Sequence, residues 1–466
     1  MEDSGGFPGG GRGRGRGIRP NRDWTKGSIL GSLLGLSLPI MVSQSLNQLG
    51  PTIDMVWVGK LGADSIAGVG VSGMIVMLTN SLNMGLFQAL RAMVSRSIGA
   101  GDEASANHAA QQSLLINIGY SVLMAVVGVF LSEHILRLFG VSPEVVKQGA
   151  AYIRIQYIGT VTFAMRNFSE ATMQASGDAI TPMRIAIFFR LIHLILDPFL
   201  IFGWWFFPRL GVSGAALTNI IAQGLGGGIG MWFLFSGLTR LRLSLKGFRF
   251  DRQQIWRQVK IGLPASVTGM ERTFANLLLV WFVAPFGTVA TAAHTMQQRV
   301  DNLVQLPVQG FGQGSGVLTG QNLGAGKPER AEKTAWLTVA LVTGAMTIVS
   351  VLIWFGAEKV VRIFNTEPGL VTVSSTFIRI NIVNYLSFGV VQILSQSLNG
   401  AGDTLVTMIT TMASIWMVQV PLAYFLPHMT HLGVYGVRWA MVIAFSIRGI
   451  IYTIYFRSGR WKRTRV

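Results

Sequence analysis

The chain has 466 residues, of which 50% are hydrophobic and only 12% are charged, and it contains no cysteine. Soluble domains carry about 25% charged residues, so this composition excludes an ordinary soluble enzyme or binding domain. The lack of cysteine excludes disulfide bonds, thiolate metal sites and cysteine nucleophiles. A mean hydropathy of +0.48, with recurring apolar runs of about the 20 residues that cross a bilayer, predicts a polytopic α-helical membrane protein.

The formal net charge of +18 is concentrated in three basic segments, which are residues 1–26, 239–252 and 457–466. Basic segments that flank membrane spans stay in the cytoplasm. We therefore predict a multi-pass protein of the plasma (inner) membrane, with both termini and the 239–252 linker on the cytoplasmic side. An even number of spans must then lie on each side of the linker.

The N-terminal segment 1–26 contains GGFPGGGRGRGRG and has too few apolar residues to bury a core. We expect a disordered basic tail. Segments rich in arginine and glycine also contact nucleic acids, but a solvated tail beside anionic lipid explains the same composition. We expect membrane lipid and no nucleic acid as a partner.

The remainder of the chain consists of two similar halves, 27–238 and 253–456. The Leu-Pro pair at 38–39 recurs 225 positions later, and SIGAG recurs as NLGAG with the same offset. The segment LFGVSPEVVKQGAAYIRI also aligns without a gap to IFNTEPGLVTVSSTFIRI at that offset. An internal duplication explains a register that is held over this length.

Each half has room for six spans. In chain order we predict spans at 28–50, 63–92, 105–132, 148–172, 178–204, 211–237, 253–284, 288–316, 331–357, 370–397, 403–426 and 433–456. Six is even, so both halves enter the membrane in the same orientation, related by an axis along the membrane normal. The predicted fold is an all-α membrane protein of twelve transmembrane helices in two six-helix lobes. Repeat pairs of this kind are typical of transporters that rock around a central site.

Polar residues that occur in only one half are the candidates for function, because the shared fold does not require them. In the first half they form helical stripes at the first, fourth and fifth spans, where successive members lie three or four residues apart. They are Gln44, Asn47 and Asp54; Asn167 and Glu170, with Arg166 one turn away; and Arg190, His193 and Asp197. A charge at the bilayer centre costs about 2.5–3.5 kcal/mol, so these groups must face one another or water.

Two interpretations of the first-half charges remain open. Burial favours the neutral form of a carboxyl group, so Asp54 and Asp197 are suited to take up and release a proton or another cation. We predict that His193, Asn167 and Asn47 complete this ion-coupling group. Alternatively, the ion pairs Arg190–Asp197 and Arg166–Glu170 hold helices together without further function.

The second half has a stripe of its own in the eighth span, formed by His294, Gln298 and Asp301, and Glu271 lies in the seventh span. Two interpretations of these residues are open. They form a site for a cationic substrate, or the charges are neutralised within the pairs Glu271–Arg272 and Arg299–Asp301. Isolated histidines do not indicate a metal site, and we expect neither metal nor cofactor. No phosphate-binding loop with a lysine is present, so an ion gradient must drive transport.

Several motifs together resemble the multidrug and toxic compound extrusion (MATE) family. They are DMVWVGKLGADSIAG, SIGAGDEASA, LDPFLIFG and LGVSGAALTN in the first half, and APFGTVATAAH and NLGAGKPERA in the second. The resemblance covers about residues 28–456 in order. It implies a V-shaped pair of lobes and the export of organic cations or other amphipathic compounds in exchange for H⁺ or Na⁺. We expect a monomer.

Within this family the chain is most similar to the damage-inducible and archaeal branch. The resemblance implies a coupling site in the N-terminal lobe, with Asp54, Asp197 and Asn167 at matching positions. His193 stands where that branch has an asparagine, which favours H⁺ over Na⁺ because histidine titrates near neutral pH. The other large branch has acids in its C-terminal lobe, and at those places this chain has Arg272 and Gly389.

The predicted function is secondary active export of cationic, amphipathic drugs, coupled to inward H⁺ or Na⁺, and not an enzymatic activity. A flippase of lipid-linked sugar precursors is an alternative. It would need a cationic cavity for a pyrophosphate, for which the candidates are Arg166, Arg184, Arg190, Arg299 and Arg379. An intramembrane enzyme that uses His193 and Asp197 is a third hypothesis.

Overall fold

The computed structural model of the chain describes residues 23–464 except 62, 139, 141 and 363–366. Within these residues the structure is helical and contains no strand. The first half forms α1 (Ile29–Val58), α2 (Ala63–Gly99), α3 (Glu103–Leu138), α4 (Pro143–Ile158), α5 (Thr160–Ser176), α6 (Ile180–Phe202) and α7 (Val212–Ser236). The second half forms α8 (Arg252–Val283), α9 (Thr288–Gly324), α10 (Pro328–Arg362), α11 (Pro368–Gly400), α12 (Thr404–Ala413), α13 (Val420–Met429) and α14 (Val434–Arg457).

The all-helical fold class is confirmed, and each predicted span corresponds to one helix or to one interrupted helix. The fourth span is divided into α4 and α5 at Gly159. The eleventh contains a π-helical turn, η3 (Ser414–Gln419), between α12 and α13. Short 3₁₀ turns, η1 (Gly59–Leu61), η2 (Ala284–Phe286) and η4 (Arg460–Arg463), follow α1, α8 and α14. Several helices extend beyond the predicted spans because their polar ends continue the helix past the apolar stretch.

Apolar side chains cover much of the outer surface. Phe355 is 81% exposed, Phe130 71% and Trp281 68%. Among the described residues, eight helical segments are long and apolar enough to cross a membrane. Because exposed aromatic and aliphatic side chains are favourable in lipid but not in water, this surface is that of a multi-pass membrane protein.

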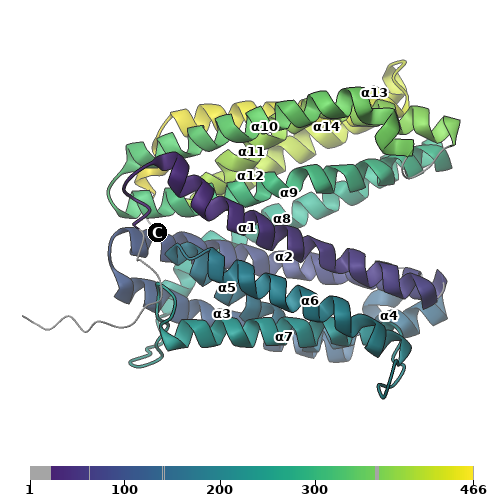
Figure 1. Ribbon diagram of the computed structural model, residues 1–466. Helices are drawn as coiled ribbons and strands as arrows, with labels where there is room; N and C mark the ends of the chain where they lie inside the picture. Colours follow the sequence, from purple (N-terminus) through teal and green to yellow (C-terminus); the bar gives the residue numbers. More distant parts are fainter. Residues whose placement is uncertain (1–22, 62, 139, 141, 363–366, 465–466) are drawn as a thin grey trace, which may run out of the picture.

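The helices form two groups, α2–α7 and α8–α14, and α1 runs obliquely between them (Figure 1). Helix α2 packs against α8 and α9, and α1 packs against α9 and α6. An extended apolar core lies mainly within the first group, where it includes Phe87, Leu90 and Phe168, and Ile261 of α8 packs against it. The interface between the lobes is therefore made by the first two helices of each repeat.

The internal repeat is visible in the backbone. Gly101 and Gly326 end equivalent helices with positive φ angles of 77° and 68°, and Gly177 and Gly402 do so at 100° and 88°. Glycine adopts this left-handed conformation without the steric penalty of a Cβ atom. Both pairs are 225 residues apart, so the turns shared by the two halves are structural.

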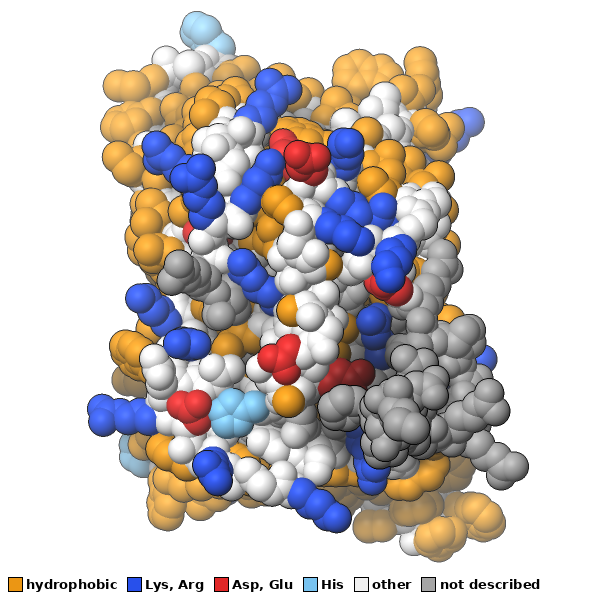
Figure 2. Space-filling model, turned by 90° about the vertical axis from the view of Figure 1, so that its left-hand side faces the viewer, with side chains coloured by type: hydrophobic (Ala, Val, Ile, Leu, Met, Phe, Trp, Pro, Cys, Tyr) orange, Lys and Arg blue, Asp and Glu red, His pale blue; other side chains and the backbone are white. Residues whose placement is uncertain are grey.

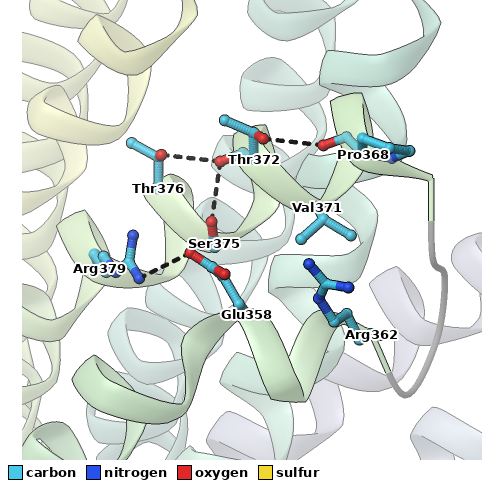
Figure 3. A pocket seen from close by; sticks show the side chains of 8 residues that line it. All are labelled: Glu358, Arg362, Pro368, Val371, Thr372, Ser375, Thr376 and Arg379. Atoms are coloured by element: carbon cyan, nitrogen blue, oxygen red, sulfur yellow. Dashed lines mark hydrogen bonds and ion pairs between the residues drawn. The ribbon is translucent and has the colours of Figure 1, made fainter.

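An ion pair is also repeated. Glu133 of α3 pairs with Arg154 of α4 at 3.2 Å, and Glu358 of α10 pairs with Arg379 of α11 at 3.3 Å. The second pair lines a small pocket between the ends of α10 and α11 (Figure 3). Because both halves carry the same pair at the same place, we interpret it as a link between neighbouring helices.

Helices α2 and α9 cross in backbone contact near the chain termini. A Cβ atom on Gly99 would collide with the carbonyl oxygen of Gln321, and one on Gly324 would collide with that of Arg96. Arg96 and Gln321 are themselves 225 residues apart, so the crossing is symmetric. The two glycines belong to the repeated SIGAG and NLGAG motifs, which explains why both halves have them.

Residues 23–26 differ from the expectation of a disordered tail over 1–26. The indole Nε1 of Trp24 donates to the carbonyl of Gly177 at 3.0 Å. Lys327 and Arg330 of the other lobe donate to the carbonyls of Thr25 and Lys26 at 2.9 and 3.2 Å. This short segment therefore bridges the lobes, while the rest of the predicted tail lies outside the described residues.

Basic side chains gather at the end of the bundle that carries the C-terminus (Figure 2). The exposed arginines and lysines of the central linker belong to the connection between α7 and α8, and include Arg242, Lys246 and Arg249. Figure 2 shows Lys and Arg spread over this face, with hydrophobic side chains at its rim. The distribution fits a polar end that projects from a membrane.

Candidate ion-coupling site

A proline in α1 frees a backbone acceptor beside the candidate acids. Pro51 lies inside α1 and has no N–H to bind the carbonyl of Asn47 four residues earlier. The guanidinium Nη2 of Arg190, in α6, donates to that carbonyl at 3.3 Å. Asp54 follows one turn after Pro51 and is buried, so the proline, the arginine and the acid occupy the same region.

The predicted stripe of α6 exists and points into the N-terminal lobe. Arg190, His193 and Asp197 are buried, with exposed fractions of 8%, 1% and 0%. They lie on one side of the helix because their spacings of three and four residues match its turn. Pro198 remains inside α6 without ending it.

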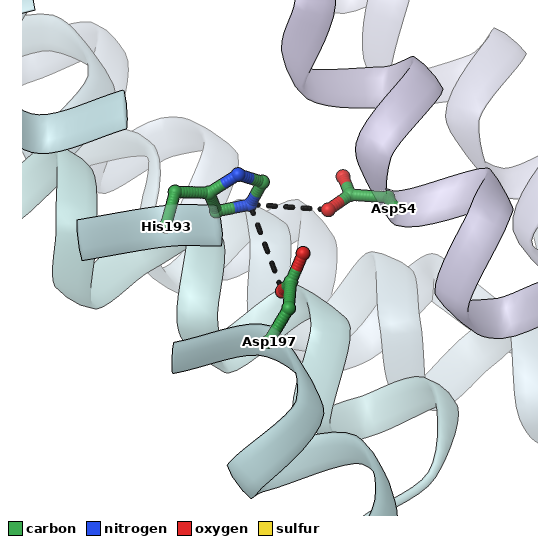
Figure 4. A group of neighbouring side chains, drawn as sticks. All are labelled: Asp54, His193 and Asp197. Carbon is green, nitrogen blue, oxygen red and sulfur yellow. Dashed lines mark ion pairs between the residues drawn. The ribbon is translucent and has the colours of Figure 1, made fainter. Parts of the chain in front are cut away.

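The structure brings Asp54, His193 and Asp197 together between α1 and α6 (Figure 4). The Nε2 atom of His193 is 3.0 Å from Oδ1 of Asp54 and 3.8 Å from Oδ1 of Asp197. One potential ligand atom from each residue lies within 4.8 Å of the others. An imidazole and two carboxylates at this separation are arranged to bind a proton or a small cation.

Few donors approach the two aspartates. Apart from Nε2 of His193 and the hydroxyl of Thr218 beside Asp197, no described donor binds Oδ1 of Asp54 or the carboxylate oxygens of Asp197. Buried polar atoms in folded proteins normally have a partner, and the cost of leaving an acceptor unsatisfied is high. These oxygens are therefore available to a proton or an ion in a way that a structural carboxylate is not.

Arg190 does not pair with Asp197, so that interpretation of the α6 charges is wrong. Its Nη1 lies 3.0 Å from Nδ1 of His193, and its guanidinium group packs 5.1 Å from the ring centre of Phe189. The arginine thus contacts the ring nitrogen that faces away from the carboxylates.

A second buried arginine joins the other polar residues of the lobe. Arg166 pairs with Glu170 at 2.9 Å, and it donates to the side-chain oxygens of Asn47 and Asn167, both at 3.2 Å. The ion-pair alternative for Glu170 is therefore the arrangement found. Asn47 and Asn167, predicted as coupling residues, are instead bound to Arg166.

Gln44 lies at the contact between the lobes. Its Nε2 donates to Oε1 of Gln313 in α9 at 2.9 Å. A similar amide pair joins Gln88 of α2 to Gln396 of α11 at 2.7 Å. Gln44 therefore belongs to the interface rather than to the group around Asp54.

In the second lobe, Asp301 is fully engaged by neutral donors. Its Oδ1 accepts hydrogen bonds from Gln297 at 2.8 Å, Asn381 at 2.6 Å and Tyr385 at 2.8 Å. Arg299 is exposed, so the predicted Arg299–Asp301 pair is wrong. The three hydrogen bonds on one oxygen distinguish Asp301 from the first-lobe acids.

His294 and Gln298 belong to the same buried region. Nδ1 of His294 lies 2.8 Å from Nη2 of Arg438, and Nε2 lies 3.1 Å from the amide of Gln298. Sequence reasoning missed Arg438, which is 1% exposed. The internal repeat could have indicated it. Near the end of the chain the two halves are offset by 222 residues, and at that offset Arg438 aligns with Ala216, so the charge occurs in one half only.

Glu271 is buried, with the indole of Trp416 and the positive charge of Arg448 nearby. The predicted Glu271–Arg272 pair is wrong, since Nη1 of Arg272 donates instead to Gln392 at 3.5 Å. Phe274 and Trp416, which form an aromatic pair with ring centres 5.8 Å apart, lie on α8 and the nearby π-helical turn.

The five arginines considered for a pyrophosphate site do not form one buried cluster. Arg166 and Arg190 are engaged in the first lobe as described. Arg379 pairs with Glu358, and Arg184 and Arg299 are exposed. The geometry thus offers no support for a shared pyrophosphate cavity built from these residues.

Comparison with known proteins is consistent along the whole chain. The MatE family model matches residues 39–199 and 264–425, one match in each lobe. The chain is 27% identical to "Probable multidrug resistance protein YpnP" of Bacillus subtilis, covering 95% of this chain and 98% of that protein. It is 24% identical to "FAD transporter" of Shewanella oneidensis, covering 90% and 92%.

A solved structure has the same fold. It is described as the "outward-facing conformation of a multidrug resistance MATE family transporter of the MOP superfamily", and it superposes with a TM-score of 0.88 at 23% identity, covering 95% of this chain and 98% of that one. With a match of the family model in both halves, the chain belongs to the MatE family of multidrug and toxic compound extrusion membrane transporters.

Proposed function

We propose that this chain exports cationic, amphipathic drugs from the cytoplasm in exchange for protons that enter through Asp54, His193 and Asp197. The observation that carries the proposal is the sharing of one imidazole nitrogen by two buried carboxylates, neither of which forms an ion pair with an arginine or lysine of the described residues. Sodium ions are the alternative coupling ion at the same carboxylates.

The contrast between the lobes supports a coupling site in the first lobe. One oxygen of Asp301 accepts three hydrogen bonds and Glu170 pairs with Arg166, so each acid already has partners. Asp54 and Asp197 gain a partner whenever a proton arrives. This asymmetry also fits the damage-inducible and archaeal branch, to which we assign the chain.

The contacts between the lobes support alternating access. The glycine crossing at Gly99 and Gly324 joins the lobes where α2 and α9 end, at the end of the bundle that carries the C-terminus (Figure 1), and the pairs Gln44–Gln313 and Gln88–Gln396 join α1 to α9 and α2 to α11. With the basic linker in the cytoplasm, as we propose, this conformation is closed to the cytoplasm. Separation of those contacts would open the space between the lobes to the cytoplasm.

In the proposed cycle the acids are ionised while the cavity opens inwards and a cationic drug binds. Protonation from the outside discharges the acids, changes the packing of α1 beyond its internal Pro39, and releases the drug. Glu271, with Phe274 and Trp416 nearby, is a contact for a cation in the second lobe. We propose that the protein works as a monomer in the plasma membrane.

The substrate class follows from relatives named as multidrug resistance proteins, whereas one relative is named as an FAD transporter. The test is efflux of a fluorescent organic cation from proteoliposomes, under an imposed pH gradient and, separately, under a sodium gradient. We expect the pH gradient alone to drive efflux, and Glu358→Gln, which removes a repeated ion pair far from the acids, to behave like the wild type.

Efflux driven only by the sodium gradient would replace the proton with sodium as the coupling ion. Export of a flavin nucleotide without export of any cation would refute the substrate class. Absence of transport under either gradient, with folded protein in sealed vesicles, would refute the proposal as a whole.

A further inference from the structure

We infer that Arg190 is the residue that makes the site selective for protons over sodium ions. It does so by holding His193 in the tautomer that presents an N–H group, rather than a lone pair, to Asp54 and Asp197. That protons drive transport rests on the proposed function, but the tautomer of His193 and the affinity of the site for sodium ions can be measured without transport.

Helix α1 is shaped to receive Arg190. Gly50 lies against the guanidinium group, and a Cβ atom there would be 2.8 Å from Nη2 and 2.9 Å from Cζ. Pro51 leaves the carbonyl of Asn47 without a helical donor, and Nη2 of Arg190 takes that place at 3.3 Å. Gly50 thus leaves space for the guanidinium group of Arg190, and Pro51 provides it with a free backbone acceptor.

The position of Arg190 determines the protonation of the neutral imidazole. Arginine carries only donors, so at a separation of 3.0 Å between Nη1 and Nδ1 of His193 the ring nitrogen must accept. A neutral imidazole has one N–H, and with Nδ1 as acceptor that hydrogen is on Nε2. Nε2 is the atom 3.0 Å from Asp54 and 3.8 Å from Asp197.

This tautomer treats a proton and a sodium ion differently. A proton joins a carboxylate oxygen and leaves the Nε2–H in place beside the other acid. A hard cation needs several oxygen ligands and no facing hydrogens, and here it meets the Nε2–H and the nearby positive charge of Arg190. The site therefore accepts protons and rejects sodium ions.

Other charged groups around the cluster do not produce this selectivity. The hydroxyl of Tyr152, on α4, lies near Asp54 and Asp197, and the hydroxyl of Thr218, on α7, lies beside Asp197; both groups are neutral. From α5, Arg166 is paired with Glu170, so their charges compensate each other. Arg190 is the cation of the described lobe that contacts His193 directly.

The experiment uses purified full-length protein and two readouts that do not need transport. The first is ¹⁵N NMR of histidine-labelled protein, with the His193 signals assigned by their loss in His193→Gln. The second is sodium binding, measured as the rise in melting temperature in sodium chloride over choline chloride. The variants are Arg190→Gln, Arg190→Lys and Gly50→Ala, with Arg184→Gln as the matched control because Arg184 is exposed on the same helix.

In the wild type we expect His193 to carry hydrogen on Nε2 and not on Nδ1, with no sodium effect. Arg190→Gln should admit the other tautomer and raise the apparent sodium affinity at least about tenfold, as expected for removal of one nearby unit charge. Arg190→Lys should retain the wild-type tautomer. Gly50→Ala should act like Arg190→Gln, because it displaces the guanidinium group without removing its charge from the chain.

Hydrogen on Nδ1 of His193 in the wild type would overturn the inference. An unchanged tautomer and unchanged sodium affinity in both Arg190→Gln and Gly50→Ala would also overturn it. Either result leaves the efflux test of the proposed function untouched, and failure of efflux leaves these two measurements interpretable, so the two claims fail separately.

Discussion

Replacing Asp197 by asparagine should uncouple efflux from the pH gradient while leaving the fold intact. The side chain is 0% exposed, and apart from Nε2 of His193 and the nearby Thr218 hydroxyl no described donor approaches its oxygens. An amide has the same shape, and burying it costs less free energy than burying an ionised carboxylate. We therefore expect Asp197→Asn to be at least as stable as the wild type.

The magnitude follows from the number of protons that the site exchanges. One pH unit supplies about 1.4 kcal/mol for each proton, which sustains a tenfold concentration ratio of substrate. Removing one of the two carboxylates next to His193 removes its proton from the cycle. The steady-state substrate ratio held by a gradient of one pH unit should thus fall by at least about tenfold.

The assay is the steady-state distribution of a fluorescent cation in proteoliposomes, with the membrane potential clamped to zero. Glu358→Gln serves as an acid-to-amide control, because Glu358 is half-exposed and pairs with Arg379 at the end of the bundle. Substrate affinity in detergent should be retained in both variants. A wild-type substrate ratio in Asp197→Asn would refute the role of this carboxylate in coupling.

Three further predictions concern the second lobe, the crossing of the lobes and the linker. Asp301→Asn should lower the melting temperature, because three donors converge on one oxygen of Asp301 and the variant places an N–H₂ group among them; each hydrogen bond lost costs about 0.5–1.5 kcal/mol. The pH-driven efflux per folded molecule should persist, and unchanged melting would contradict this account. Gly324→Leu should prevent the lobes from closing beside Arg96. The chain has no cysteine, so Ser95→Cys introduces a single one at a buried position, and this cysteine should react faster with a water-soluble maleimide when Gly324→Leu is present. Equal reaction rates with and without Gly324→Leu would disprove the prediction. The backbone N–H of Gln254 and the ring of His108 bind Asp251 at the start of α8 and hold its pKa below the usual 3.8. This stabilisation of the fold is present above pH 3.8 and is lost as the pH falls through the lowered pKa. The melting temperature of Asp251→Asn should therefore fall less in acid than that of the wild type.

Much of the fold could be predicted because helix periodicity and an internal repeat are local properties of the sequence. The spacing of Arg190, His193 and Asp197 alone places them on one stripe. That Asp54 meets this stripe was expected from the family resemblance, and the structure has His193 Nε2 within 3.0 Å of it.

The remaining features depend on contacts between distant segments. Gln297 and Gln298 are both within one turn of Asp301, and only the packing of α11 against α9 determines that Gln297 binds it. Arg448 donates to Ser414 at 2.5 Å within the π-helical turn, an interruption that helix periodicity does not predict. Asn47 and Asn167 were assigned to the ion site by position in the sequence, but Arg166 reaches them first.

The central claim is that substrate and protons compete through the two acids of the first lobe. Its most direct test is to add an organic cation to purified, weakly buffered protein and to count the protons released with a pH-indicator dye. We predict proton release on binding to the wild type and none from the double variant Asp54→Asn, Asp197→Asn. Equal release from both proteins would show that the exchanged protons come from elsewhere.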